Sequence, residues 1–74
     1  MSKLEIDKHG KRWRNKRGQL HRKNGPAAIW YDGDITWNKN DQFHRIDGPA
    51  YCWNDGDKSW HLDDIFIREF QYDK

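Results

Sequence analysis

Short stretches rich in aromatic and β-branched residues alternate with turn-forming residues along most of the chain. Asp-Gly pairs at 32–33 and 55–56 each separate two such stretches, which predicts tight two-residue β-hairpin turns. Asn-Gly-Pro-Ala at 24–27 and Asp-Gly-Pro-Ala at 47–50 combine turn formers with a proline, which opens a strand or lies at a sheet edge. The pattern predicts an all-β fold, a single antiparallel meander of stacked hairpins.

A repeat of 23 residues underlies this pattern. Residues 14–36 and 37–59 are identical at 12 of 23 positions, and a third copy begins at Trp60 without the His-Arg-x-Asp-Gly-Pro-Ala block. An incomplete last copy is what a repeat array needs as a cap. We therefore expect one repeat domain over residues 1–74, with a partial hairpin at 1–13 and a partial repeat and cap at 60–74.

Most of the recurring residues are expected to make the fold. The imidazole and guanidinium groups of the His-Arg pairs can hydrogen-bond nearby carbonyls or the turn side chains of Asn24 and Asp47. The alternative is a row of ligand-reading side chains along one surface of the array. The residues expected to be structural are His21, Arg22, Gly25, Pro26, Trp30, Gly33, Trp37, His44, Arg45, Gly48, Pro49, Trp53, Gly56 and Trp60.

Two-residue turns would fix the register of the hairpins and gather the aromatic residues on one face. Trp30 would lie opposite Ile35, and Ala28 opposite Trp37, with an equivalent set in the second copy. Such a face is too apolar to leave in water. We expect residues 65–72 to cover it as a helical turn or a last strand; a second copy in a homodimer and a partner are the alternatives.

Charge is unevenly distributed along the chain. Residues 1–31 hold nine Lys or Arg against two acids, and residues 32–74 hold five against ten. The segment from Lys8 to Lys23 contains eight basic residues and no acid, which would attract a phosphate backbone or an acidic protein. The alternative is a solvated basic edge that discourages strand-to-strand aggregation.

Composition argues against several other functions. The chain has no apolar run long enough for a membrane span and no apolar signal core at its start. Its only cysteine, Cys52, cannot form an internal disulfide and is expected to be a small packed residue; this favours a cytoplasmic location. The four histidines lack zinc spacing, and the acids flank turns. We expect no metal, no cofactor and no catalytic activity.

The repeat resembles MORN (membrane occupation and recognition nexus) repeats, and more closely the MORN-like arrays of small phage and bacterial proteins. His44-Arg45-Ile46-Asp47-Gly48-Pro49-Ala50 fits the His-Arg-x-Asp-Gly-Pro-Ala block of those arrays, and residues 21–27 depart from it only by Asn for Asp. The likeness covers residues 13–62 and departs from the standard Tyr-x-Gly-x-Trp pattern. It implies stacked hairpins and a non-enzymatic binding role.

These features lead to three hypotheses. The first is a small phage or bacterial accessory protein that binds a host protein and inhibits or redirects it, for example a component of host defence. The second is nucleic-acid or nucleotide binding through the basic segment, with Trp13 stacking on bases. The third is a homo-oligomer with a ligand pocket of Trp and Arg side chains between its subunits. The residues expected to contact a partner are Arg12, Trp13, Arg14, Arg17 and Tyr31.

Overall fold

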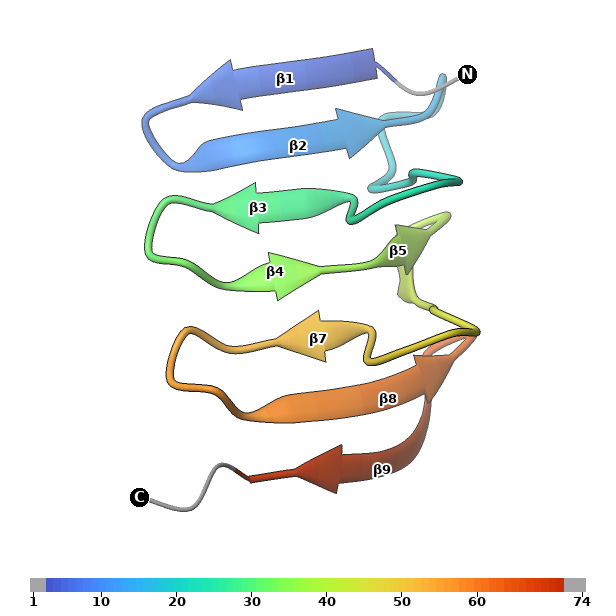
Figure 1. The fold of residues 1–74 in the computed structure, drawn as a ribbon. Coiled ribbons are helices and arrows are strands. Elements are labelled where there is room, and N and C mark those ends of the chain that lie inside the picture. The colour runs from blue at the N-terminus through green and yellow to red at the C-terminus, as the bar shows by residue number, and fades with distance from the viewer. Residues whose placement is uncertain (1–2, 72–74) are drawn as a thin grey trace.

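The computed structural model describes residues 3–71, which form an antiparallel sheet with a small hairpin attached (Figure 1). Seven strands lie in the order β1-β2-β3-β4-β7-β8-β9, and β5 and β6 pair separately. The predicted all-β antiparallel meander is confirmed. Residues 72–74, which end the predicted cap, lie outside the described residues. The strands are β1 (Lys3–Asp7), β2 (Gly10–Arg14), β3 (Ala28–Trp30), β4 (Ile35–Thr36), β5 (Asn38–Lys39), β6 (Gln42–Phe43), β7 (Tyr51–Cys52), β8 (Lys58–Leu62) and β9 (Ile65–Phe70).

The 23-residue period reappears in the positions of the strands. β3 and β7 begin 23 residues apart, as do β4 and β8, and β6 and β9. In the last copy the segments equivalent to β4 and β5 are joined in the single strand β8, and β9 continues past the point where β6 ends. None of the segments within residues 3–71 is a helix that could cross a membrane.

The Asp-Gly turns contain three residues, so the expected two-residue geometry is wrong. The Trp30 amide donates to the Asp34 carbonyl (2.9 Å), and the Gly33 amide donates to the Trp30 carbonyl (2.9 Å). Gly33 has a φ of +101°. This is a turn followed by a left-handed residue, a conformation that glycine adopts without strain. The second hairpin repeats it, with Gly56 at a φ of +99°.

The extra turn residue shifts the register by one and divides the aromatic residues between the two faces. Ala28 lies opposite Thr36, and Ile29 lies opposite Ile35. Because successive side chains in a strand point to opposite faces, Trp30 is on the other side of the sheet from Trp37. Trp53 and Trp60 are separated in the same way. The predicted single aromatic face is therefore wrong.

The C-terminal segment extends the sheet and does not cover a face of it. β9 pairs antiparallel with β8, with a register shift at Trp60 and His61, and becomes an edge strand. Its apolar side chains stay half exposed, among them Phe66 and Phe70. Of the two forms expected for the cap, the strand is the one observed, but the expectation that it lies over the aromatic side chains is wrong.

The sheet is one layer thick. The molecule measures 38 × 27 × 15 Å, and the buried apolar side chains are three alanines, Ala27, Ala28 and Ala50. No large side chain among the described residues is completely buried. A single layer cannot form an apolar core, so hydrogen-bonded ladders and contacts between neighbouring repeats must provide most of the stability.

Candidate binding groove

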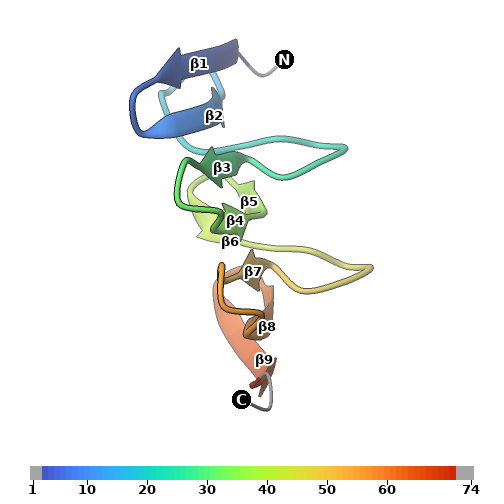
Figure 2. The ribbon, with the colours of Figure 1, turned by 60° about the vertical axis from the view of Figure 1, so that its left-hand side comes forward.

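Two loops project from the same side of the sheet, as Figure 2 shows. They are residues 20–27, the first loop, and residues 43–50, the second loop, and each contains one copy of the His-Arg block. The first loop follows β2 and leads into β3, and the second follows β6 and leads into β7. The last copy, which lacks the block, has no such loop.

An arginine from each loop holds it against the sheet. The Arg22 guanidinium lies over the Trp13 indole, 3.9 Å from the ring centroid, and that of Arg45 lies over Trp37 at 3.8 Å. Arg68 of β9 lies over Trp60 at 4.3 Å, so the stack recurs with the 23-residue period. We call the side of the sheet that carries these three pairs the Arg–Trp face.

A glycine covers the outer side of each loop guanidinium. A Cβ atom on Gly25 would lie 2.9 Å from Cζ of Arg22, and one on Gly48 would lie 2.7 Å from Cζ of Arg45. Only a residue without a side chain leaves room for the arginine at these positions. Both guanidinium planes are thus occupied, by indole on one side and by glycine on the other.

Hydrogen bonds complete the packing of each arginine within its loop. Nη1 of Arg22 donates to the Pro26 carbonyl (3.3 Å), and Nη1 of Arg45 donates to the Pro49 carbonyl (3.2 Å). Nε of Arg45 also donates to Oδ1 of Asp47 (3.0 Å). The repeated His-Arg-x-Asp-Gly-Pro-Ala block therefore builds the loop around its own arginine.

The histidine of each block joins its repeat to the next one. Nδ1 of His21 accepts the Asn40 amide (3.1 Å), and Nδ1 of His44 accepts the Asp63 amide (3.1 Å). Asn40 and Asp63 are the first residues of two-residue turns with positive φ. At the second turn residue, the carboxylate of Asp41 accepts the amide of the residue before His21 (2.6 Å). These contacts fix each loop relative to the hairpin of the following copy.

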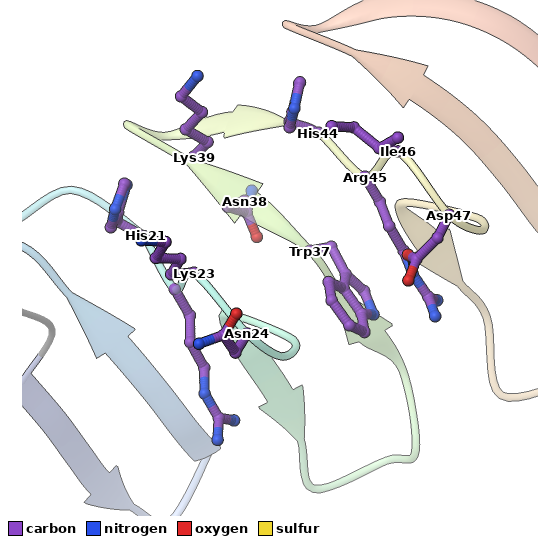
Figure 3. A pocket seen from close by; sticks show the side chains of 11 residues that line it. His21, Lys23, Asn24, Trp37, Asn38, Lys39, His44, Arg45, Ile46 and Asp47 are labelled. Atoms are coloured by element: carbon purple, nitrogen blue, oxygen red, sulfur yellow. The ribbon is translucent and has the colours of Figure 1, made fainter.

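The space between the two loops is a groove of about 780 Å³, shown in Figure 3. Trp37 and Asn38, in the connection from β4 to β5, line it from below. His21–Asn24 of the first loop and His44–Asp47 of the second line its sides, together with Lys39. We call this space the loop groove.

The lining of the loop groove is basic. It contains Arg22, Lys23, Lys39, Arg45 and two histidines, and its one acid, Asp47, is paired with Arg45. Lys23 and Lys39 are exposed, and neither makes an ion pair with another described residue. Ile46 has 86% of its surface exposed at the rim. The groove thus offers two free ammonium groups and an apolar rim.

Charge also differs between the faces of the sheet. The strand register places Lys11, Lys58 and Arg68 on the Arg–Trp face, beside or opposite its tryptophans. Acids of the strands and turns point to the opposite face, including Glu5 and Asp7. A ligand approaching the Arg–Trp face therefore meets predominantly positive charge.

Arg12 does not match its predicted role as an exposed contact residue. It is 6% exposed, on the face opposite the loops, and Nη2 donates to Oε1 of Glu5 (2.7 Å) and to the carboxylate of Asp7. The hydrogen bond from Arg12 holds the pKa of the Asp7 carboxyl below its usual range, and the His9 amide adds to the effect. Arg12 is committed to this ion-pair cluster.

The other predicted contact residues are dispersed. Trp13 is half-buried under the first loop, and Arg14 is half-exposed and donates to the Gly18 carbonyl (2.9 Å). Arg17 is exposed in the turn after β2, and Tyr31, 82% exposed, lies in the turn after β3. These two turns are at opposite ends of the sheet, so the predicted set does not form one site.

The sequence analysis missed Lys39 and Ile46 as site residues. The usable signal lies at positions where the two copies differ, such as Lys23 against Ile46 and Asn24 against Asp47. Repeated positions build the loops, whereas these differing positions are at the exposed tips. In a repeat array, such positions are free to carry recognition.

The geometry shows little arrangement for metal binding or covalent chemistry. Within residues 3–71, no group of three or more His, Cys, Asp or Glu side chains is placed to hold a metal ion. Cys52 is half-buried on β7. On the opposite face, Tyr51 lies beside Asp34 (3.4 Å); burial raises the pKa of its hydroxyl, and the Asp34 charge adds to the rise.

Comparison with protein-family models, with curated proteins and with solved structures finds no match to this chain. The resemblance to MORN-like repeats therefore stays a prediction.

Proposed function

We propose that the protein is a non-enzymatic interaction module that binds a partner protein on its Arg–Trp face, at the loop groove. The observation that carries this proposal is the division of labour within the loops. His21, Arg22 and Gly25, with their equivalents in the second copy, are occupied in holding the loops, while Lys23 and Ile46 are presented at the tips. A rigid scaffold that displays variable loop residues is a common arrangement for binding.

The narrower form of this proposal is a phage or bacterial accessory protein that acts in the cytoplasm and inhibits or redirects a host protein. It rests on the resemblance of the His-Arg-x-Asp-Gly-Pro-Ala block to small phage and bacterial arrays. Identification of the captured partner is the measurement that tests it.

Nucleic-acid binding through the Lys8–Lys23 segment has less support from the geometry. The turns at 8–9 and 16–18 lie at opposite ends of β2, and Arg12 is in an ion-pair cluster on the face away from the loops. Arg22 covers the indole of Trp13. The segment is therefore spread over two ends and two faces, and the plane of Trp13 next to Arg22 is closed to a base.

Affinity capture from bacterial lysate tests the proposed function, with nuclease present and at low and high salt. We expect a defined protein partner to be recovered at high salt after nuclease treatment. Two variants with equal charge change locate the surface: Lys23→Glu with Lys39→Glu in the groove, and Lys11→Glu with Lys58→Glu elsewhere on the same face. Recovery of nucleic acid alone, or of no specific protein, would count against the proposal.

A further inference from the structure

We infer that the loop groove binds an extended acidic peptide segment, with carboxylates at Lys23 and Lys39 and an apolar side chain between Trp37 and Ile46. This inference rests on the proposed function and names the chemistry of the partner. It commits to a peptide because charge, shape and the available aromatic surface of the groove agree on one.

Charge favours an anionic ligand. The arginines of the groove already have partners, since Arg22 and Arg45 are stacked on indoles and bonded to proline carbonyls. The ammonium groups of Lys23 and Lys39 come from opposite sides of the groove and have no described acidic partner (Figure 3). Carboxylates spaced along an extended chain can reach both without displacing an existing ion pair.

The apolar surface favours a ligand that also carries a hydrophobic side chain. Trp37 lines the floor, and Ile46, 86% exposed, stands at the rim of the second loop. A Leu or Phe side chain placed between them would cover apolar surface that the free protein leaves in water. The groove volume of about 780 Å³ lies within the range of roughly 300–1,000 Å³ that is typical of ligand sites.

The aromatic surface of the groove is too limited for a strand of bases. Single-stranded nucleic acids are held by successive bases stacking on several aromatic planes. Trp37 is the one aromatic side chain in the groove lining, and Arg45 occupies one of its planes at 3.8 Å. One aromatic contact between two ammonium groups suits a peptide with one apolar side chain between acidic residues.

Fluorescence anisotropy with labelled peptides tests the inference on the full chain. The probes are an octapeptide of Asp and Glu with a central Leu, the same peptide with Asn and Gln, and an oligothymidylate. We expect the acidic peptide to bind about tenfold more tightly than its amide counterpart at low salt, and the difference to shrink as salt is raised.

Matched variants locate the binding surface. Lys23→Glu with Lys39→Glu should weaken the acidic peptide about tenfold, whereas Lys11→Glu with Lys58→Glu should change affinity about twofold or less. Ile46→Ser should weaken it about threefold with no change in salt dependence. All four lysines are exposed, so these substitutions should leave stability within about 0.5 kcal/mol, and urea unfolding checks this.

Three results would overturn the inference: equal binding of the acidic and amide peptides, equal effects of the two double variants, or tighter binding of the oligothymidylate. Failure of the proposed function is a separate outcome. If lysate capture recovers a protein that the Lys23→Glu, Lys39→Glu variant retains in full, the interaction module stands and the groove is not its site.

Discussion

Gly48→Ala tests whether the arginine–tryptophan stack holds the loops in place. The new Cβ would lie 2.7 Å from Cζ of Arg45 and 3.0 Å from both Nε and Nη1, closer than unbonded atoms can stay. The obstructing group is the end of a flexible side chain, so Arg45 can leave its site. In doing so it gives up the contact with Trp37 and its hydrogen bonds to Pro49 and Asp47.

The expected cost follows from the contacts that are lost. Arg45 is only 23% exposed, and a partly buried cation–π contact contributes about 0.5–1 kcal/mol. The two hydrogen bonds contribute about 0.5–1.5 kcal/mol each where buried, and less at the surface. Gly48→Ala should therefore lower the free energy of unfolding by about 1–3 kcal/mol.

A double-mutant cycle isolates the clash from other effects of the substitution. Without the Arg45 side chain there is nothing for the new Cβ to strike, and Gly48 has no positive φ that an alanine would resist. In the Arg45→Ala background, Gly48→Ala should be neutral, or stabilise by about 0.4–1 kcal/mol through the entropy of the unfolded chain. The two substitutions should thus show strong coupling.

Urea unfolding followed by tryptophan fluorescence measures all four corners of the cycle. Gly25→Ala, where the distance to Cζ of Arg22 is 2.9 Å, serves as a replicate in the first loop. If Gly48→Ala costs the same with and without the Arg45 side chain, the glycine is needed for a reason other than room for the guanidinium. That result would refute the reasoning.

Three further predictions concern the turns and the opposite face. Because the folded state raises the pKa of Tyr51 above 10.0, its contribution is present below pH 10 and is lost as the pH rises through the folded pKa; urea unfolding should show wild type losing stability relative to Tyr51→Phe only in that range. The lowered pKa of Asp7 makes the opposite prediction: its contact with Arg12 contributes above the unfolded value of 3.8 and is lost as the pH falls through the folded pKa. The stability difference from Asp7→Asn should shrink there, and a constant difference would contradict it. Gly33→Ala should destabilise by about 1–3 kcal/mol in thermal unfolding because a side chain resists a φ of +101°, and an unchanged midpoint would argue against that turn conformation.

The sequence predicts the strands well because turn residues and the repeat mark their ends. It does not predict their register, because an Asp-Gly pair suits both a two-residue turn and a three-residue turn with glycine last. The second form occurs, so Tyr31 joins the turn and Trp30 changes face. A miscount of one residue is enough to misplace an aromatic side chain from one side of the sheet to the other.

The site is harder to predict than the strands because it depends on contacts between loops and strands. Nothing local indicates that Arg22 reaches Trp13, and that contact decides which way the first loop projects. Arg12 belongs to a basic run, yet pairing with Glu5 and Asp7 across the hairpin removes it from the surface. The groove residues became recognisable only once the repeated positions were seen to be occupied by the fold.

The loop groove exists because two loops follow one another, and this links repeat number to valency. A chain with two loops has one groove, and the last copy, whose Arg68 is on a strand, adds none. Insertion of one more 23-residue copy after residue 36 would give three loops and two grooves in line on one face. Two acidic segments on one partner could then be engaged together, and the second contact would benefit from the high effective concentration set by the first.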